Sequence, residues 1–480
     1  MMIRRIALGV VGCLGAAAMA CSGSAGPAGP QGQPGTAGSA APGGGTASIS
    51  GIEPSTAFLA RQPHVTISGY ATSWTDKTTI DFGAGITVSN VHAASPTALV
   101  ADLVIDKAAA LGPRDVVVDD TTKETYSQGF TVSAPAVMTL QGTLAQGGIA
   151  FANLQLQDTS TPFDTTGSQD PLSGEITYTN LALTAPAGVT ASINTATSNS
   201  VQILLTLDVD AVVGAADLDL LSGPAGDTTD ALFPVAGGLT VTAQTATALG
   251  ATPVSGNVKA AYDSALYSFA PASASLAIVD LTANSAASGA NAGFALLPKS
   301  GHFADLLGFY EAADGAGTSA TTTLLPSSTD PYYLIYWDNS GTTGAYTIGA
   351  TSTAPASTLA TTAADATIKG ALSVTALPFV LTGGNLTSDT SIDWVKITTG
   401  TGDAGKVIHV QTEGDPYTDV AVAILESDGT TAIGGDDEGA PIDTTSTAVT
   451  ASTTYYVTFA AGQLDFDPSD GTYSAIIRLE

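Results

Sequence analysis

Short runs of strand-forming residues separated by turn residues recur through residues 49–134. Each run is rich in β-branched or other apolar residues, and successive runs lie roughly ten residues apart. The runs are 64–67, 79–82, 86–88, 98–103, 114–118 and 129–132. Strands this short need a second packed sheet to bury a core. The spacing therefore predicts a β-sandwich.

The composition extends this prediction to the rest of the chain. Hydrophobic residues make up 44% of the 480 residues and charged residues only 12%, so the surface is built mostly from Thr, Ser, Gly, Ala, Asn and Gln. Thr and Val are abundant while Glu, Lys, Arg and Met are scarce, which favours strands over helices. At about 100–200 residues per domain, this length predicts three or four domains. We expect an all-β chain of tandem β-sandwiches.

The features of 49–134 resemble the IPT/TIG family of immunoglobulin-like domains in their order. The matching segments are 52–54, 65–70, 82–83, 95–99 and 129–132. The resemblance implies an immunoglobulin-like fold and an adhesive or spacer role.

Residues 135–250 read as a divergent second copy of this domain. Gly85, Leu103, Gly112 and Gly129 are answered, in the same order, by residues 188, 205, 214 and 238, at offsets of 102 to 109. An ordered series of matches at similar offsets indicates an internal repeat. Segment 138–157 alternates apolar and polar residues, and we expect it to add strands that the first copy lacks.

A second repeat occupies the C-terminal part, as 251–352 and 366–480 with a linker at 353–365. Tyr267, Tyr332 and Tyr346 recur as Trp394, Tyr455 and Tyr473, at offsets of 127, 123 and 127. The Asp-Trp start, the Tyr-Tyr strand and the Gly-x-Tyr end resemble the bacterial pre-peptidase C-terminal family. That resemblance implies two jelly-roll-like sandwiches, the first degenerate, of a kind that accompanies secreted peptidases.

Trp394 lies in the alternating segment 393–397, where it shares one strand face with Lys396 while Asp393, Val395 and Ile397 share the other. We expect Trp394 to be half-buried near a sheet edge and to anchor the strand, so that its loss costs roughly 3 kcal/mol or more. The alternative is a ligand platform.

The N-terminus resembles a bacterial lipoprotein leader. Arg4 and Arg5 precede a fifteen-residue apolar run that ends in Ala18-Met19-Ala20-Cys21. Such a run is shorter than the roughly 20 residues that a spanning helix needs, and suits a signal peptide over 1–20. The lipobox resemblance implies lipidation of Cys21, although the family prefers Leu where Ala18 stands. Ordinary cleavage after Ala20 is the alternative.

Residues 21–48 are almost wholly Gly, Ala, Pro, Ser, Thr and Gln, which predicts a disordered tether. Four collagen-like triplets occupy 26–37. A triple helix needs Gly at every third position over many repeats, so a polyproline-rich spacer is the preferred interpretation. Ser22 follows the cysteine where sorting to the inner membrane prefers Asp, which implies the outer membrane.

The chain is strongly acidic, with a formal net charge of −30. Such a field repels nucleic acid and anionic lipid. It suits a cation-rich partner, or it simply keeps threonine-rich sheets in solution. The only cysteines are Cys13 and Cys21, both near the leader, so no disulfide is expected in the body.

No catalytic motif emerges. The four histidines, at 64, 92, 302 and 409, are too far apart in sequence for a His-Glu-x-x-His pair. No Gly-x-Ser-x-Gly elbow occurs, and no region of roughly 200 residues remains for an enzyme domain. We therefore expect a non-enzyme.

Two acidic loops are candidate calcium sites, because calcium takes six to eight oxygen ligands. The candidate ligands are Asp436, Asp437, Glu438, Asp465, Asp467 and Asp470, with Asp443 close to the first three. Solvated turns are the alternative.

The sequence thus predicts an exported, lipid-anchored envelope protein without catalytic activity that binds an extracellular protein or polysaccharide. The rival function is an accessory or substrate-targeting module of a secreted peptidase.

Overall fold

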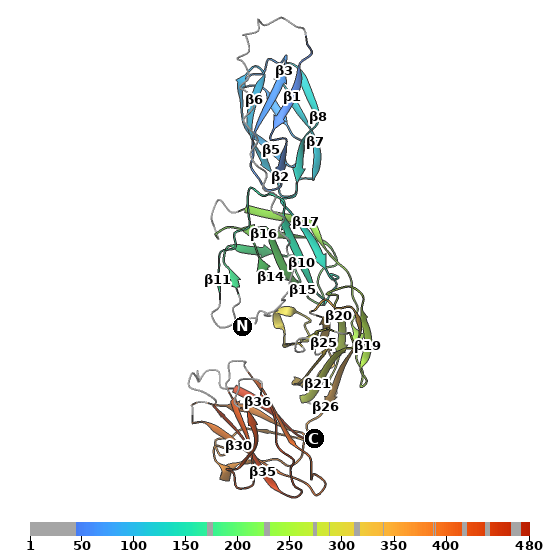
Figure 1. Ribbon diagram of the computed structural model, residues 1–480, viewed down its shortest axis with the longest axis vertical. Coiled ribbons are helices and arrows are strands. Elements are labelled where there is room, and N and C mark those ends of the chain that lie inside the picture. The colour runs from blue at the N-terminus through green and yellow to red at the C-terminus, as the bar shows by residue number, and fades with distance from the viewer. Residues whose placement is uncertain are drawn as a thin grey trace, which may run out of the picture. The chain divides into compact units, whose positions relative to one another are not determined.

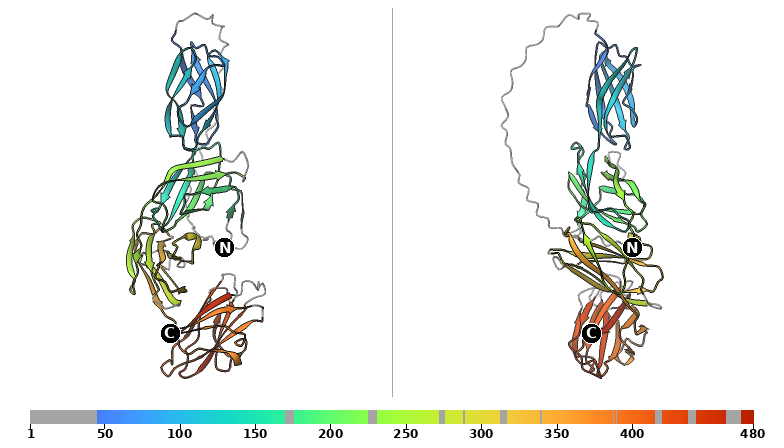
Figure 2. Two further views of the ribbon diagram at one scale, coloured as in Figure 1. Left: turned by 180° about the vertical axis from the view of Figure 1, so that it is seen from behind. Right: turned by 90° about the vertical axis from the view of Figure 1, so that its right-hand side faces the viewer.

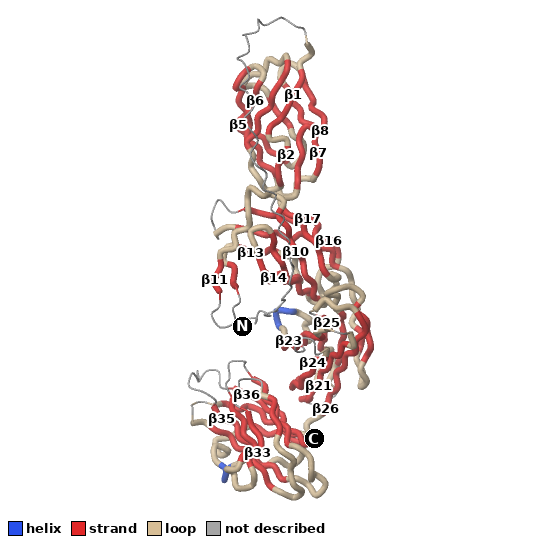
Figure 3. The backbone as a smooth tube through the Cα atoms, viewed as in Figure 1, coloured by secondary structure: helices blue, strands red, loops and turns tan. Residues whose placement is uncertain are grey.

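The computed structural model describes residues 45–480 except 170–175, 225–230, 272–275, 288, 312–316, 339, 387, 389, 415–419, 437–441 and 462–471. Strands dominate, and the described helices are the 3₁₀ turns η1 (Phe303–Asp305) and η2 (Ile368–Gly370) (Figure 3). No helix among the described residues is long and apolar enough to cross a membrane. The prediction of an all-β chain of tandem β-sandwiches is confirmed.

The first sandwich spans residues 48–133 and pairs a β1-β3-β6-β5 sheet with a β2-β8-β7-β4 sheet (Figure 1). Its strands are β1 (Ser48–Glu53), β2 (Thr56–Phe58), β3 (His64–Tyr70), β4 (Thr79–Asp81), β5 (Ile86–Ser95), β6 (Ala98–Ile105), β7 (Gly112–Asp119) and β8 (Lys123–Ser133). Along β3 and β6 buried residues alternate with more exposed ones, as the period of a half-buried strand requires. Both sheets appear in blue in the two views of Figure 2.

The second sandwich spans residues 136–241 and packs a β14-β15-β10-β9 sheet with a β13-β16-β17 sheet. Its strands are β9 (Ala136–Gln141), β10 (Ile149–Leu156), β13 (Leu181–Thr184), β14 (Val189–Ala196), β15 (Ser200–Leu207), β16 (Gly214–Ser222) and β17 (Ala231–Val241). A separate ribbon pairs β11 (Gly167–Gln169) with β12 (Ile176–Tyr178).

These two sandwiches share one topology. The order β9-β10-β15-β14 repeats β1-β3-β6-β5, and β17-β16-β13 repeats β8-β7-β4. The matched glycines also share a backbone conformation, since Gly85 and Gly188 have φ of 81° and 77° while Gly112 and Gly214 have φ of 109° and 130°. Positive φ at equivalent turns is favourable for Gly. The two sandwiches thus share their strand order and these turn conformations.

One expectation about this copy is wrong. Segment 138–157 adds no strands to the first copy's plan, because β9 and β10 occupy the places of β1 and β3. The part that is reduced is the counterpart of β2, where a single parallel bridge between Ala145 and Thr242 replaces the β2–β8 pairing. Divergent side chains concealed the match because strand pairing depends on backbone groups rather than on residue identity.

The third sandwich spans residues 247–353 and packs a β18-β20-β25-β22-β23 sheet with a β19-β26-β21-β24 sheet. Its strands are β18 (Thr247–Ala248), β19 (Val254–Val258), β20 (Ala265–Phe269), β21 (Leu276–Ser285), β22 (Ala292–Leu297), β23 (Gly308–Glu311), β24 (Thr318–Pro326), β25 (Tyr332–Asp338) and β26 (Gly344–Thr353).

The fourth sandwich spans residues 357–479 and packs a β27-β29-β36-β31-β34 sheet with a β28-β30-β35-β32-β33 sheet. Its strands are β27 (Ser357–Ala360), β28 (Leu372–Ser373), β29 (Phe379–Asn385), β30 (Ile392–Thr398), β31 (Ile408–Gly414), β32 (Val420–Leu425), β33 (Ala432–Asp436), β34 (Asp443–Thr445), β35 (Thr454–Ala461) and β36 (Thr472–Leu479). Segment 357–360, expected in a linker, forms β27 and pairs in parallel with β29.

The third and fourth sandwiches also share one topology. The order β18-β20-β25-β22-β23 repeats as β28-β30-β35-β32-β33, and β19-β26-β21-β24 repeats as β29-β36-β31-β34. In each copy the tyrosine of the Gly-x-Tyr strand covers a glycine directly opposite: Tyr346 covers Gly256 and Tyr473 covers Gly384. A Cβ at Gly256 or Gly384 would come within 2.3 or 2.2 Å of the opposing ring.

Each sandwich has its own core, and an aromatic pair packs in each of the four; in the fourth, Phe459 and Tyr473 lie 5.2 Å apart. Phe82 and Phe130 meet edge to face at 5.0 Å in the first, and Phe163 and Phe233 at 4.8 Å in the second. Tyr336 stacks on Tyr346 in the third. The described residues contain no cysteine, because both cysteines precede residue 45, so these cores form without disulfides.

Trp394 lies on the outer face of its sheet rather than in the fourth core. Val395 and Ile397 are buried in that core, whereas Trp394 is half-buried and packs edge to face on Tyr456 at 6.0 Å. The expected half-burial is confirmed. Its inward-facing neighbour is Asp393, whose carboxylate accepts the Tyr473 hydroxyl at 2.5 Å.

By contacts the chain divides into two compact units. Among the described residues, one consists of 45–245 with 260–264 and 302–304, and the other of 246–259, 265–301 and 305–480. The first unit thus contains the first two sandwiches and the second contains the third and fourth.

Candidate functional site

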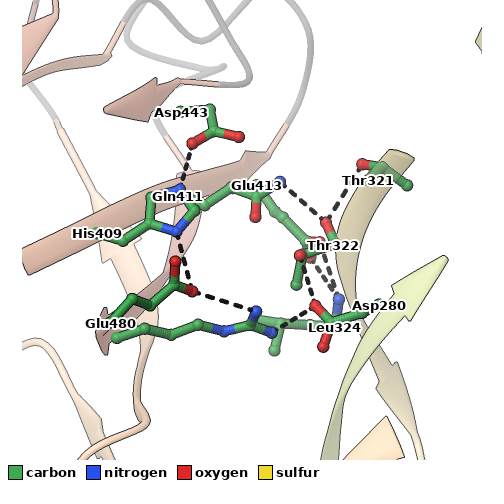
Figure 4. A network of polar contacts seen from close by, with 10 residues as sticks. Asp280, Thr321, Thr322, Leu324, His409, Gln411, Glu413, Asp443 and Glu480 are labelled. Atoms are coloured by element: carbon green, nitrogen blue, oxygen red, sulfur yellow. Dashed lines mark hydrogen bonds and ion pairs between the residues drawn. The ribbon is translucent and has the colours of Figure 1, made fainter. Parts of the chain in front are cut away.

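A mixed polar and apolar contact joins the third and fourth sandwiches within the second unit, and we call it the C-terminal joint. Its polar members are Asp280, Thr322, Leu324 (through its backbone), Gln411, Glu413 and Arg478, and its apolar members are Ile278, Val380 and Ile476. Figure 4 shows the polar members, together with His409, Asp443 and Glu480 beside them.

Strand alternation positions the two central side chains. On β31, Val410 and Thr412 point into the fourth core and are 0% and 1% exposed. Gln411 and Glu413 therefore point to the opposite face, which the third sandwich covers. Gln411 Nε2 donates to the Thr322 carbonyl at 3.1 Å.

Glu413 is bonded to the backbone of the neighbouring sandwich. Its two carboxylate oxygens lie 2.8 and 3.0 Å from the Leu324 amide nitrogen, which donates to them. Burial raises the pKa of Glu413 above its ordinary value, while the bond from Leu324 and one from Thr323 act against that rise. An acid that loses its hydration on docking needs such donors, because an unpaired buried polar group is costly.

An ion-pair chain extends from this point along the edge of the joint. Arg478 Nη2 donates to Asp280 Oδ1 at 2.6 Å, and the Thr322 hydroxyl donates to the same oxygen at 2.7 Å. Arg478 Nη1 lies 3.9 Å from Glu480 Oε1, which is 3.4 Å from His409 Nδ1. The other ring nitrogen of His409 contacts Asp443.

A cavity of about 230 Å³ lies beside the ion pair. Its polar lining includes Asp280, Arg478 and Glu480, and its apolar lining includes Leu377, Pro378 and Leu479. One guanidinium between two carboxylates gives a site of net negative charge. Such a lining suits a small polar or cationic group.

The apolar part of the joint is compact. Ile278 and Val380 are fully buried and Ile476 is 2% exposed, with Leu276 and Leu324 packed around them. These three residues belong to outer sheet faces rather than to either sandwich core. Their burial therefore depends on docking of the two sandwiches.

A second contact, which we call the N-terminal joint, ties the first sandwich to the second within the first unit. Arg61 Nε pairs with Asp158 Oδ2 at 2.8 Å, Arg61 Nη1 donates to the Leu232 carbonyl at 2.7 Å, and the guanidinium lies 4.8 Å from the centre of the Phe233 ring. Asp158 is 2% exposed. At the rim, Lys107 pairs with Asp219 at 2.6 Å.

The charge of Asp158 is held by this environment. Burial alone would raise the pKa of Asp158, but hydrogen bonds from Ser160 and Arg61 and the charge of Arg61 outweigh it, so the pKa lies below 3.8. The carboxylate thus stays ionised while buried because Ser160 and Arg61 together compensate the loss of hydration.

The structure describes only part of the sites predicted from sequence. Cys21, Asp437, Glu438, Asp465, Asp467 and Asp470 lie outside the described residues. Asp436 ends β33, where it is opposite Val422. Asp443, expected beside a calcium loop, contacts His409. Calcium binding at either loop stays a prediction.

Sequence reasoning missed a potential metal-ligand group in the first unit. Within the described ranges one group of three candidate ligands has all its ligand atoms within 4.8 Å of one another: Asp208, Asp210 and His302. His302 and Asp210 are 92 residues apart in sequence, so no local spacing reveals them. One Asp208 oxygen already accepts the Phe303 amide at 2.8 Å. The group therefore serves to hold segment 302–304 whether or not a cation binds.

Comparisons with known proteins add little to this geometry. Neither a family model nor a curated protein matches the chain. Among solved structures, the adhesin InvE of Yersinia pseudotuberculosis aligns at 14% identity and TM-score 0.17, over 39% of this chain and 58% of that one. The chain thus spans less than two thirds of InvE.

Two further solved structures align over larger shares of their own length. Domains 5–6 of the S-layer protein SbsC align at 11% identity and TM-score 0.14, over 42% of this chain and all of that one. The Bacteroides ovatus glucan-utilisation protein SGBP-B, solved with a mixed-linkage heptasaccharide, aligns at 10% identity and TM-score 0.14, over 61% and 73%. Such low scores carry no inference about fold or function.

Proposed function

We propose that this chain is a non-catalytic scaffold or binding protein of the cell envelope, exported and lipid-anchored at Cys21. The observation that carries the proposal is the pair of joints, which fix consecutive sandwiches to one another through buried hydrogen bonds and an ion pair. A spacer or display protein needs fixed geometry between modules. The Gly- and Pro-rich segment 21–48 then serves as the tether between membrane and first sandwich.

Localisation and anchoring are tested first. In cells that express the full chain, we expect mass spectrometry of the mature N-terminus to find a diacylglyceryl group on Cys21, and fractionation to place the chain in the outer membrane. Cys21→Ser should release it to the soluble fraction. An unmodified Cys21 in the wild type would refute the proposed lipid anchor, but it would not contradict the proposed scaffold role.

The ligand side of the proposal has its own experiment. Immobilised mature chain, incubated separately with envelope polysaccharide and with envelope protein, should retain one fraction saturably, and a casein-hydrolysis assay should find no activity. Retention of neither fraction would leave a pure spacer. Hydrolysis by the purified chain would overturn the proposal.

The rival role is that of an accessory or substrate-targeting module for a secreted peptidase. It is favoured by the shared topology of the third and fourth sandwiches together with their resemblance to the pre-peptidase C-terminal family. Affinity purification of the chain from culture separates the roles, because an accessory module should co-purify with peptidase activity and a scaffold should not.

A further inference from the structure

Strand β24 lies at the edge of its sheet. The order β19-β26-β21-β24 gives it one neighbour, β21, and leaves its other side without a strand of the same sheet. Its pairing with β21 runs without a bulge from Asn284–Thr318 to Leu276–Pro326. A long, regular edge strand presents a row of unpaired N–H and C=O groups, on which another strand readily adds.

Side chains of the fourth sandwich occupy this open side. The carbonyl of Thr322 accepts from Gln411 Nε2, and the amide of Leu324 donates to the Glu413 carboxylate. Thr322 and Leu324 are two residues apart on β24, as Gln411 and Glu413 are on β31. The two side chains therefore satisfy alternate backbone groups, as a neighbouring strand would (Figure 4).

The strand carries few protections of its own. Proteins guard edge strands with charged residues, bulges, prolines or a covering element. The nine residues of β24, TSATTTLLP, include no charged side chain, and the only proline stands at the last position. The covering element is thus the main protection that this edge has.

We infer that Gln411 and Glu413 cap β24, and that opening of the C-terminal joint turns this edge into a strand-addition site for β24 of a second copy of the chain. Antiparallel pairing of one strand with itself is self-complementary, so it closes a two-fold dimer. The uncharged β24 also lets two copies of a chain of net charge −30 meet without placing carboxylates of the two strands opposite each other.

The test compares the chain over residues 22–480 with a joint-open variant that carries Gln411→Ala, Glu413→Ala and Ile476→Asp. Ile476 belongs to the joint rather than to the fourth core, so an aspartate there favours an undocked but folded sandwich. Sedimentation velocity should find the wild type monomeric and the variant dimeric, with self-association at least about tenfold tighter. Added salt should tighten the dimer because it screens the like charges.

A matched blocking change identifies the strand. Ala320 is exposed and lies two residues before Thr322, so its amide faces the same open side. Ala320→Pro removes that donor where an edge strand tolerates proline. Added to the joint-open variant it should restore the monomer, and in the wild type it should change nothing.

A second readout covers the case in which the triple variant does not fold. Glu413→Ala alone, which removes the acceptor of the Leu324 amide, should bind a fluorescent peptide of sequence TSATTTLLP more tightly than the wild type does, measured by anisotropy. A folded joint-open variant that stays monomeric, or a dimer that Ala320→Pro leaves intact, would overturn the proposal. So would equal peptide binding by Glu413→Ala and wild type.

Discussion

The two joints fix neighbouring sandwiches by different chemistry. The N-terminal joint centres on one arginine, which neutralises the buried Asp158 and also bonds a backbone carbonyl. In the C-terminal joint, none of the described bonds of the buried Glu413 carboxylate comes from an arginine. The backbone N–H of Leu324 donates to this carboxylate, and an apolar cluster packs in the same joint. The comparison teaches that a buried acid at a domain boundary is stabilised either by an opposite charge or by hydrogen bonds from uncharged donors, here the Leu324 amide and Thr323.

The difference has opposite consequences for protonation. Hydrogen bonds from Ser160 and the pairing with Arg61 together outweigh burial and place the pKa of Asp158 below its ordinary value, whereas burial places the pKa of Glu413 above it. Docking at the N-terminal joint therefore releases a proton near that pKa, and docking at the C-terminal joint takes one up.

The largest expected effect concerns Arg61. Arg61→Met should cost about 3 kcal/mol in the unfolding free energy of the first unit, because it leaves Asp158 buried without its partner. Urea denaturation of the mature chain measures this. Arg61→Met combined with Asp158→Asn should recover part of the loss. If Arg61→Met alone loses no more stability than the double variant does, Arg61 and Asp158 are not coupled.

The apolar cluster should come next. Ile476→Ala removes a buried side chain from the C-terminal joint and should cost about 2 kcal/mol in docking of the third and fourth sandwiches. Hydrogen exchange of the Leu324 amide, which is bonded across the joint, reports that docking. Unchanged exchange would show that the polar bonds alone hold the joint.

Lowering the pH should change the stability of the two joints in opposite directions. The Glu413 contribution is fully present below its unfolded pKa of 4.5 and is lost as pH rises through the higher docked value. The Asp158 contribution is present above 3.8 and is lost as pH falls through the lower docked value. Lowering pH from 7 should first raise the protection of the Leu324 amide, taken relative to the intrinsic exchange rate at each pH, while the protection of amides near Asp158 changes only in stronger acid. In Glu413→Gln the first change should vanish; if it persists, another group is responsible.

The smallest effect is expected at the rim. Lys107 is 53% exposed, so solvent screens its pair with Asp219. Lys107→Met should leave the denaturation curve of the mature chain unchanged within error. A clear loss of stability there would mean that the N-terminal joint relies on two ion pairs rather than one.

Much of the fold was predictable because it depends on local signals. The run at 64–67 lies in β3, and the matched Gly85 and Gly188 both mark turns with positive φ before β5 and β14. Spacing and turn residues reveal strands and their duplication. They do not reveal β27, since 357–360, which reads Ser-Thr-Leu-Ala, is paired as a strand only with β29.

The joints were not predictable, because their partners lie far apart in the chain. Arg61 and Asp158 are separated by 97 residues, and Gln411 and Thr322 by 89. The alternation of β31 does place Gln411 and Glu413 on the face away from the core. Nothing in it indicates that another sandwich covers that face. Likewise, strand alternation correctly predicted which face Trp394 lies on. It gave no reason to expect that the inward-facing Asp393 accepts a hydrogen bond from the Tyr473 hydroxyl.

The glycine–tyrosine pairs impose an order on evolutionary change. In the third and fourth sandwiches the ring of Tyr346 or Tyr473 fills the space that a side chain at Gly256 or Gly384 would need. A larger residue at the glycine clashes while the tyrosine remains, and loss of the tyrosine uncovers the glycine and part of a core. The effect of a substitution at one position of the pair therefore depends on which residue occupies the other position. In each sandwich the pair is therefore free to change only as a unit, which makes it a shared structural feature of the third and fourth sandwiches.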